Sequence, residues 1–143
     1  MRVTVVLVSA LIAIHPAALC ESTWSISRIS GLNYNQQQIA DNRVGTVEIR
    51  CYLDQGGRVA DLKAISGPAD LVEMAAANAR EWVFQRTAGN GNARCKGNEC
   101  TLVYEFKVYE VSRRNVHPYF QFTLPDRIVV VGERIIPLRV EAN

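Results

Sequence analysis

The sequence predicts an α+β fold, in which one main helix packs against a small three-stranded sheet with antiparallel and parallel strand directions. Apolar side chains alternate along residues 47–53 and again along residues 101–109, as they do in half-buried strands. Between these segments, residues 71–82 place apolar side chains at helical spacing. A further β-rich run covers residues 119–140 and forms an additional C-terminal extension.

The first strand leads through a hairpin turn into the second. Its core-facing residues are Val47, Ile49, Cys51 and Leu53. The turn is Asp54-Gln55-Gly56-Gly57, whose glycines can adopt the positive φ that hairpin turns need. The second strand, residues 58–65, cannot place all its apolar residues on one face at a strict period of two. We therefore expect a β-bulge near Ala60-Asp61, which would restore the register.

Two helices are predicted. Residues 35–41 suit a short helix before the first strand. Gly67-Pro68 ends the second strand, and the main helix begins near Ala69-Asp70. Its core-facing stripe is Leu71, Met74, Ala75, Asn78, Ala79 and Trp82. We expect Trp82 and Phe84 to close one end of the core.

The strand order follows from the usual handedness of crossover connections. A right-handed crossover through the main helix makes the second and third strands parallel. The first strand then lies between them, antiparallel to both, in the order 2-1-3. The second and third strands are consequently expected to be edges. Residues 119–140 could form an added hairpin, cover one of these edges, or pair with another molecule.

Residues 1–20 have the features of an export signal. They contain a basic residue, an apolar stretch over residues 3–14, and a small-x-small cleavage site that ends at Cys20. We therefore expect a periplasmic mature chain that begins at Glu21. Two alternatives stay open. One is lipid attachment to Cys20, although Leu19 stands where a lipid-attachment signal usually has a small residue. The other is an uncleaved membrane anchor.

The charge of the chain gives no indication of a nucleic-acid partner. Residues 1–20 hold one of the 16 Lys and Arg residues and none of the 14 Asp and Glu residues, which leaves the remainder close to neutral. A protein that binds nucleic acid usually shows a basic patch or stripe in its sequence, and this chain has no basic run. We expect one domain with a modest core.

Three cysteines follow the predicted cleavage site: Cys51, Cys95 and Cys100. Thiols oxidise readily outside the cytosol. A bond between Cys95 and Cys100 would close a loop of about six residues and contribute about 2 kcal/mol. Cys51 is expected to be a buried free thiol. A zinc site would need two further ligands, and His117 is the single histidine available, so no metal is predicted.

No catalytic residue and no cofactor are predicted. The chain lacks a Gly-x-Ser-x-Gly motif, and its carboxylates are scattered over polar faces. A dinucleotide-binding loop follows a buried parallel strand and opens a helix. Neither Gly56-Gly57 nor the pair Gly89 and Gly91 has this position. We therefore expect this protein not to be an enzyme.

An ordered set of short motifs resembles the C-terminal domain of TonB-type energy transducers. The motifs are Leu32-Asn33-Tyr34, Gly45-Thr46-Val47, Gly57-Arg58-Val59, Ser66-Gly67 and Trp82-Val83-Phe84. The resemblance covers about residues 32–109, and it departs from the family where Asn35 replaces a proline. It implies a TonB-like domain over residues 32–110, between an N-terminal segment, 21–31, and the β-rich extension, 111–143.

The resemblance implies a module that binds an extended, TonB-box-like segment of an envelope or outer-membrane protein by β-strand addition. By position, the implied partner-binding residues are Leu32, Asn33 and Tyr34, together with Leu102, Val103, Tyr104, Glu105, Phe106, Lys107, Val108 and Tyr109. We expect the module to act without the membrane anchor and Pro-rich span of a full energy transducer. The alternative is a secreted structural or assembly protein that forms a homodimer through its C-terminal strands.

Overall fold

The computed structural model describes residues 22–32, 34–89, 91, 93–111, 119–123 and 126–135. The elements are β1 (Ser22–Arg28), α1 (Gln36–Ala40), β2 (Gly45–Leu53), β3 (Val59–Ser66), α2 (Ala69–Ala79), β4 (Val83–Ala88), β5 (Cys95–Lys96), β6 (Glu99–Val111), β7 (Tyr119–Thr123) and β8 (Arg127–Ile135). The predicted export signal with Cys20, the predicted contact residue Asn33 and the histidine His117 lie outside the described residues.

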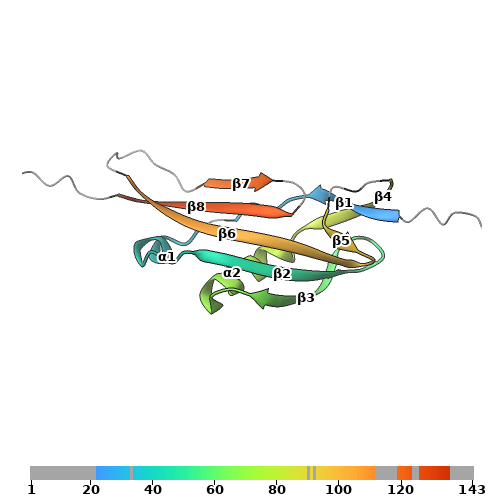
Figure 1. Cartoon of the computed structure of the whole chain (residues 1–143), viewed down its shortest axis with the longest axis horizontal. Coiled ribbons are helices and arrows are strands. Elements are labelled where there is room, and N and C mark those ends of the chain that lie inside the picture. The colour runs from blue at the N-terminus through green and yellow to red at the C-terminus, as the bar shows by residue number, and fades with distance from the viewer. Residues whose placement is uncertain are drawn as a thin grey trace, which may run out of the picture.

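The protein has the predicted α+β class, but its main sheet is larger than expected. The sheet has six strands in the order β3-β2-β6-β8-β7, with β5 beside β6 (Figure 1). β2 lies between β3 and β6 and is antiparallel to both. β8 is parallel to β6 and antiparallel to β7. The prediction of three strands was wrong because the C-terminal strands, treated as a separate extension, continue the same sheet.

The N-terminal segment forms a second sheet that was not predicted from the sequence. β1 pairs antiparallel with β4, with Ser22 opposite Ala88 at one end. The main helix was expected to reach Trp82, but α2 ends at Ala79 and Phe84 lies in β4. Residues 83–88 contain β-branched and aromatic side chains, and pairing with β1 gives these residues a strand conformation.

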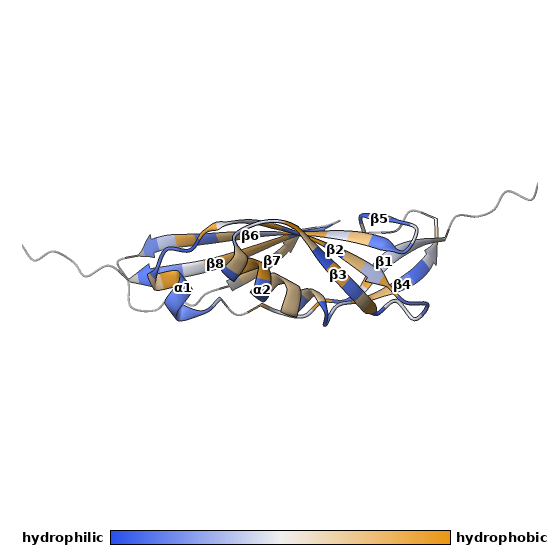
Figure 2. Cartoon of the chain, turned by 90° about the horizontal axis from the view of Figure 1, so that it is seen from below, coloured by the Kyte–Doolittle hydropathy of each residue, from blue (hydrophilic) through white to orange (hydrophobic). Residues whose placement is uncertain are grey.

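The core lies between the main sheet and the helices. Figure 2 shows both helices on one side of this sheet. The predicted core-facing residues of β2 are all buried, as are Leu71, Ala75, Asn78 and Ala79 of α2. Trp82 and Phe84 are buried as predicted, with exposed fractions of 0% and 1%. The patterns of β2 and α2 therefore identified the buried faces, although Met74 of the predicted stripe is only half-buried.

The β2–β3 hairpin contains the predicted bulge. The register passes from Tyr52 opposite Asp61 to Leu53 opposite Val59, so Ala60 is the extra residue.

The turn of this hairpin also connects the two sheets. Gly57 has a φ of 77°, and its carbonyl accepts a hydrogen bond of 2.8 Å from the Phe84 N–H. A Cβ at Gly57 would lie 1.9 Å from the Phe84 carbonyl oxygen. Glycine is therefore required here, both by the positive φ and by the close approach of β4.

Asn78 is the polar centre of the core. Its Nδ2 donates to the carbonyl oxygens of Ser30 and Gly31, at 2.9 and 3.1 Å. Its Oδ1 accepts from Trp82 Nε1 at 3.0 Å and from the Tyr104 hydroxyl at 2.9 Å. One buried amide thereby joins the segment before α1, the end of α2 and strand β6.

The predicted disulfide is present between Cys95 and Cys100. These residues pair across β5 and β6, and Cys100 also lies opposite Cys51 of β2. Cys51 is free and buried. Burial raises the pKa of its thiol from 9.0 to about 12.

We predict that iodoacetamide leaves Cys51 of the native protein unmodified at neutral pH and modifies it after unfolding. The thiolate is the reactive form, and a raised pKa together with burial makes it scarce and inaccessible. The stability contributed by the protonated thiol is fully present below pH 9.0 and is lost as the pH rises toward about 12. Mass spectrometry of alkylated peptides measures the modification of Cys51 before and after unfolding. A bridge from Cys51 to either other cysteine would contradict the assignment.

Candidate functional site

Strand addition needs a row of unpaired backbone N–H and C=O groups, so the edges of the main sheet are the candidate sites. The third strand, which is β6, was expected to be an edge that residues 119–140 could either cover or leave open. In the structure, β8 pairs with β6 from Val103 opposite Arg127 to Val111 opposite Ile135. Of the alternatives that the sequence left open, the structure therefore shows the covered edge, because a later strand of the same chain occupies it.

The short strand β5 covers the remaining part of the same β6 edge. Two backbone hydrogen bonds bridge the junction between β5 and β8: Thr101 N–H donates to the Arg94 carbonyl at 2.9 Å, and Val103 N–H donates to the Asp126 carbonyl at 2.8 Å. The side chains of Arg94 and Asp126 also form an ion pair of 3.2 Å beside this junction. The β6 edge is thus paired from Glu99 to Val111.

β8 is an integral part of the core rather than a loosely attached strand. Ile128, Val130 and Val131 are at most 1% exposed. Each such side chain contributes roughly 1.5–3 kcal/mol through burial. A Cβ at Gly132 would lie 2.5 Å from Ile39 Cγ1, which shows how closely α1 packs on β8. Displacement of β8 by a peptide would therefore remove a large part of the stability of the domain.

The predicted contact residues of the third strand all lie in β6, but they face both sides of the sheet. Leu102, Tyr104 and Phe106 are buried in the core. The half-buried members are Val103, Glu105, Lys107 and Val108, and Tyr109 is exposed. Contact between these residues and a partner stays a prediction.

The other predicted contact segment does not form one surface with the third strand. Tyr34 is buried, and its ring lies 5.4 Å from that of Phe106, centroid to centroid. Burial and the nearby charge of Asp70 raise the pKa of Tyr34 to about 12. Leu32 instead lines a shallow groove of about 230 Å³ beside Met74 of α2. Tyr34 is therefore a core residue, whereas Leu32 is partly accessible.

Two outer strands remain, and β3 is the better protected. Its pairing with β2 has two register shifts, and it carries the charged residues Asp61 and Lys63. Bulges and charges on an edge strand discourage pairing with another chain. β3 therefore has the features of an edge that avoids strand addition.

β7 lacks these protections. Its sequence, Tyr-Phe-Gln-Phe-Thr, has no charge and no proline, and its register with β8 has no shift. Phe122 packs edge-on against Trp82 at 5.4 Å between ring centroids, whereas Gln121 and Thr123 are exposed. Within the described residues β7 pairs with β8 alone, and Figure 1 shows it at the margin of the sheet.

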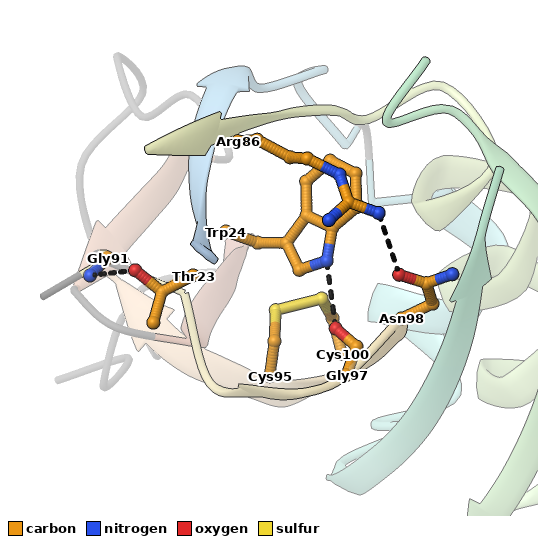
Figure 3. The surroundings of a disulfide bond; sticks show 8 residues. All are labelled: Thr23, Trp24, Arg86, Gly91, Cys95, Gly97, Asn98 and Cys100. Atoms are coloured by element: carbon orange, nitrogen blue, oxygen red, sulfur yellow. Dashed lines mark hydrogen bonds between the residues drawn. A yellow bond between two sulfur atoms is a disulfide. The ribbon is translucent and has the colours of Figure 1, made fainter. Parts of the chain in front are cut away.

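Trp24 supports the turn between β5 and β6 near the disulfide, a role that was not predicted from the sequence. Its Nε1 donates to the Gly97 carbonyl at 2.8 Å, and the Arg86 guanidinium lies 4.7 Å from the ring centroid (Figure 3). Trp24 is 2% exposed and stands next to the Cys95–Cys100 bond. The alternation of Trp24 and Ile26 along residues 22–28 was the available signal for a strand here.

These features define a small α+β domain whose main sheet has one protected edge strand, β3, and one, β7, that pairs on a single side within the described residues. The family model for the Gram-negative bacterial TonB protein C-terminal domain matches residues 30–105, just over half of the chain. The chain therefore belongs to the TonB C-terminal family. Domains of this family are periplasmic, interact with envelope proteins and form no known enzyme family.

The comparisons with curated proteins and with solved structures found no match. Among the described residues, the helices are too short or too polar to cross a membrane. The match also ends at residue 105, so β7 and β8 lie beyond the part of the chain that it covers.

Proposed function

We propose that this protein is an exported TonB-like interaction module that binds an extended segment of an envelope or outer-membrane protein by β-strand addition. The observation that supports it is the unprotected edge of β7, residues Tyr119–Thr123. The captured segment would pair with β7 and extend the sheet outward from β6 and β8. Main-chain hydrogen bonds would supply the affinity, and exposed side chains such as Gln121 and Thr123 the selectivity.

The proposed position differs from the one that the family resemblance implied. The resemblance places capture on the third strand, residues Leu102–Tyr109, whose edge β8 holds in this chain. β8 and β7 together move the free edge outward by two strands. Leu32 lies in the groove beside α2 and belongs to no strand, so its role would be separate from strand addition at β7.

We predict that Gln121→Pro abolishes peptide capture, whereas Gln121→Ala leaves it nearly unchanged. Proline removes one backbone N–H, and alanine removes only the exposed side chain. Binding of synthetic segments from outer-membrane receptors is measured on the ¹⁵N-labelled full-length protein, with the amide signals of β7 and β6 followed separately. Perturbation confined to residues 102–109, with β7 unaffected, would contradict the proposed edge.

Thermal unfolding of the same variants provides the control. Backbone N–H groups of successive strand residues point to opposite sides of the strand. If Gln121→Pro lowers the melting temperature strongly, the Gln121 N–H bonds to β8, and the comparison is repeated with Phe122→Pro and Phe122→Ala. Equal binding by the proline and alanine variants at the outward-facing position would eliminate backbone capture by β7.

A second function, self-association, is favoured by the same uncharged strand. β7 could pair antiparallel with β7 of another copy, because a two-fold interface brings the same surface patch together from both subunits. Sedimentation velocity over a range of protein concentrations distinguishes the two functions. A dimer that dissociates on addition of a receptor segment would link them through one edge, whereas a dimer insensitive to every segment would favour a structural role.

A further inference from the structure

A row of basic side chains crosses the main sheet on the face opposite the helices. Arg50 of β2 lies opposite Lys63 of β3 on one side and opposite Thr101 of β6 on the other. Arg94 continues the row, because its carbonyl accepts the Thr101 N–H. We call the three cationic residues Lys63, Arg50 and Arg94, together with Thr101 between the two arginines, the basic row.

The register shows which face carries this row. Directly opposite residues of neighbouring strands project from the same face of a sheet. The next level along the strands contains Cys51 opposite Cys100, both of which are buried in the core. Since successive residues alternate between faces, Arg50 and Thr101 point away from the helices. The basic row is therefore separate from the core and from the edge of β7.

The basic row is unfavourable for folding considered alone. Like charges placed directly opposite each other destabilise a sheet, and Arg50 and Lys63 are such a pair. Within the described part of the chain, Lys63 forms no ion pair with a carboxylate, and the Arg50–Glu99 pair is long at 3.8 Å. Glu99 thus compensates Arg50 only in part, and an arrangement that opposes local stability is typical of a functional surface.

The surface beside the row is hollowed and has an excess of positive charge. A shallow hollow of about 390 Å³ is lined by Arg50, Arg94, Cys95, Lys96, Glu99 and Thr101. Three of these side chains are cationic and one is a carboxylate. Arg50 and Arg94 pair with Glu99 and Asp126, but their side chains remain 41% and 68% exposed, so a ligand can still reach both guanidinium groups.

We infer that the basic row binds an acidic segment of a partner protein, laid across the strands. Guanidinium groups bind carboxylates through paired hydrogen bonds, and a threonine hydroxyl can donate a further one. Neighbouring strands are about 4.8 Å apart, so the row from Lys63 to Arg94 spans about 14 Å, or about four residues of extended peptide. The charges lie along a line instead of converging on one point, which suits several carboxylates better than a single phosphate.

The test uses the full-length protein and two short peptides. One peptide alternates Glu and Ser, and its matched control replaces every Glu with Gln. We expect the Glu peptide to shift the Thr101 amide and the side-chain signals of Arg50 and Arg94, with the affinity falling as salt is added. The inference is overturned if the Gln peptide binds equally well, or if inorganic phosphate produces the same shifts at the same concentration.

Variants then assign the binding to the basic row. Arg50→Gln combined with Lys63→Gln should weaken binding about fivefold to tenfold, which corresponds to two exposed ion pairs. Its melting temperature should stay unchanged or rise, because a like-charge contact is removed. The matched control, Arg28→Gln with Arg80→Gln, makes the same charge change on exposed residues outside the row and should keep the original affinity. Equal losses in both double variants would show a net-charge effect and overturn the inference.

The single variant Lys63→Gln repeats the test with one exposed residue of an edge strand. It should weaken binding of the Glu peptide by a smaller factor and leave the Gln peptide unaffected. An unchanged affinity for the Glu peptide in this variant would show that Lys63 does not contact the peptide, and it would overturn the assignment of the site to these four residues. Because this site lies away from β7, its test does not depend on capture at that edge.

Discussion

Replacement of Trp82 by alanine is expected to lower the free energy of unfolding by roughly 3–5 kcal/mol. Trp82 is 0% exposed and lies between Phe84 and Phe122, with ring centroids 6.5 and 5.4 Å away. Its Nε1 also donates to Asn78. The substitution would leave a cavity where α2, β4 and β7 meet, so the loss would be a large fraction of the stability of a domain of this size.

Urea denaturation followed by circular dichroism measures this effect, because fluorescence would mix the signal of Trp82 with that of Trp24. Arg80→Ala is the control, since Arg80 is an exposed neighbour at the end of α2. The control should change the stability by no more than about 0.5 kcal/mol. Free access of a water-soluble quencher to Trp82 in the native protein would contradict the assignment of this residue to the core.

Asn78→Leu is expected to cost roughly 3–5 kcal/mol, because it leaves several buried polar groups without partners. The Trp82 indole N–H and the Tyr104 hydroxyl would both lose the acceptor Oδ1. The carbonyls of Ser30 and Gly31 would lose the donor Nδ2. Leucine keeps the number and branching of the side-chain heavy atoms of asparagine, so the substitution would leave no cavity, and the loss would report chiefly the hydrogen bonds.

A double-mutant cycle with Tyr104→Phe separates one of these bonds from the rest. Tyr104→Phe removes the hydroxyl that donates a hydrogen bond to Asn78 Oδ1, and this should cost about 1 kcal/mol. In the Tyr104→Phe background, Asn78→Leu should then cost less than in the wild-type protein, because one buried group is no longer left unpaired. Strict additivity of the two substitutions would mean that the Asn78–Tyr104 hydrogen bond contributes nothing to folding.

The proposed function depends on which strand is outermost, and this is where the chain departs from the expectation drawn from its family. The family match ends at residue 105, within β6. Of the two strands that follow, β8 covers the β6 edge, and β7 is the outer strand of the sheet within the described residues. A receptor segment that bound only after loss of β8 would return the site to residues 102–109, and the amide signals described above distinguish these positions.

Local features of the sequence determined a substantial part of this structure. The alternation of residues 47–53 and the glycines at 56 and 57 predicted β2 and its turn, and the broken pattern after them predicted the bulge at Ala60. The stripe from Leu71 to Ala79 predicted the buried face of α2. These predictions succeeded because period, turn chemistry and helix boundaries depend on residues close together in the chain.

The disulfide was also predictable from the sequence, because the short separation between Cys95 and Cys100 suits a bond across a tight hairpin. The end of α2 was not predicted. Helical spacing continues to Trp82, and only the pairing of β4 with the distant β1 explains why the chain becomes extended there. Trp24, whose indole binds the β5–β6 turn, was missed for the same reason.

The tertiary structure alone decided where the last strand lies. The sequence of residues 127–135 indicates a strand, but a period of two specifies which side chains share a face and not which strand is the neighbour. β8 lies between β6 and β7, parallel to the first and antiparallel to the second. That choice depends on the burial of Ile128 and Val130 and on the packing of Gly132 against Ile39, contacts between residues far apart in the sequence. The free edge, and with it the candidate site, therefore follows from long-range packing.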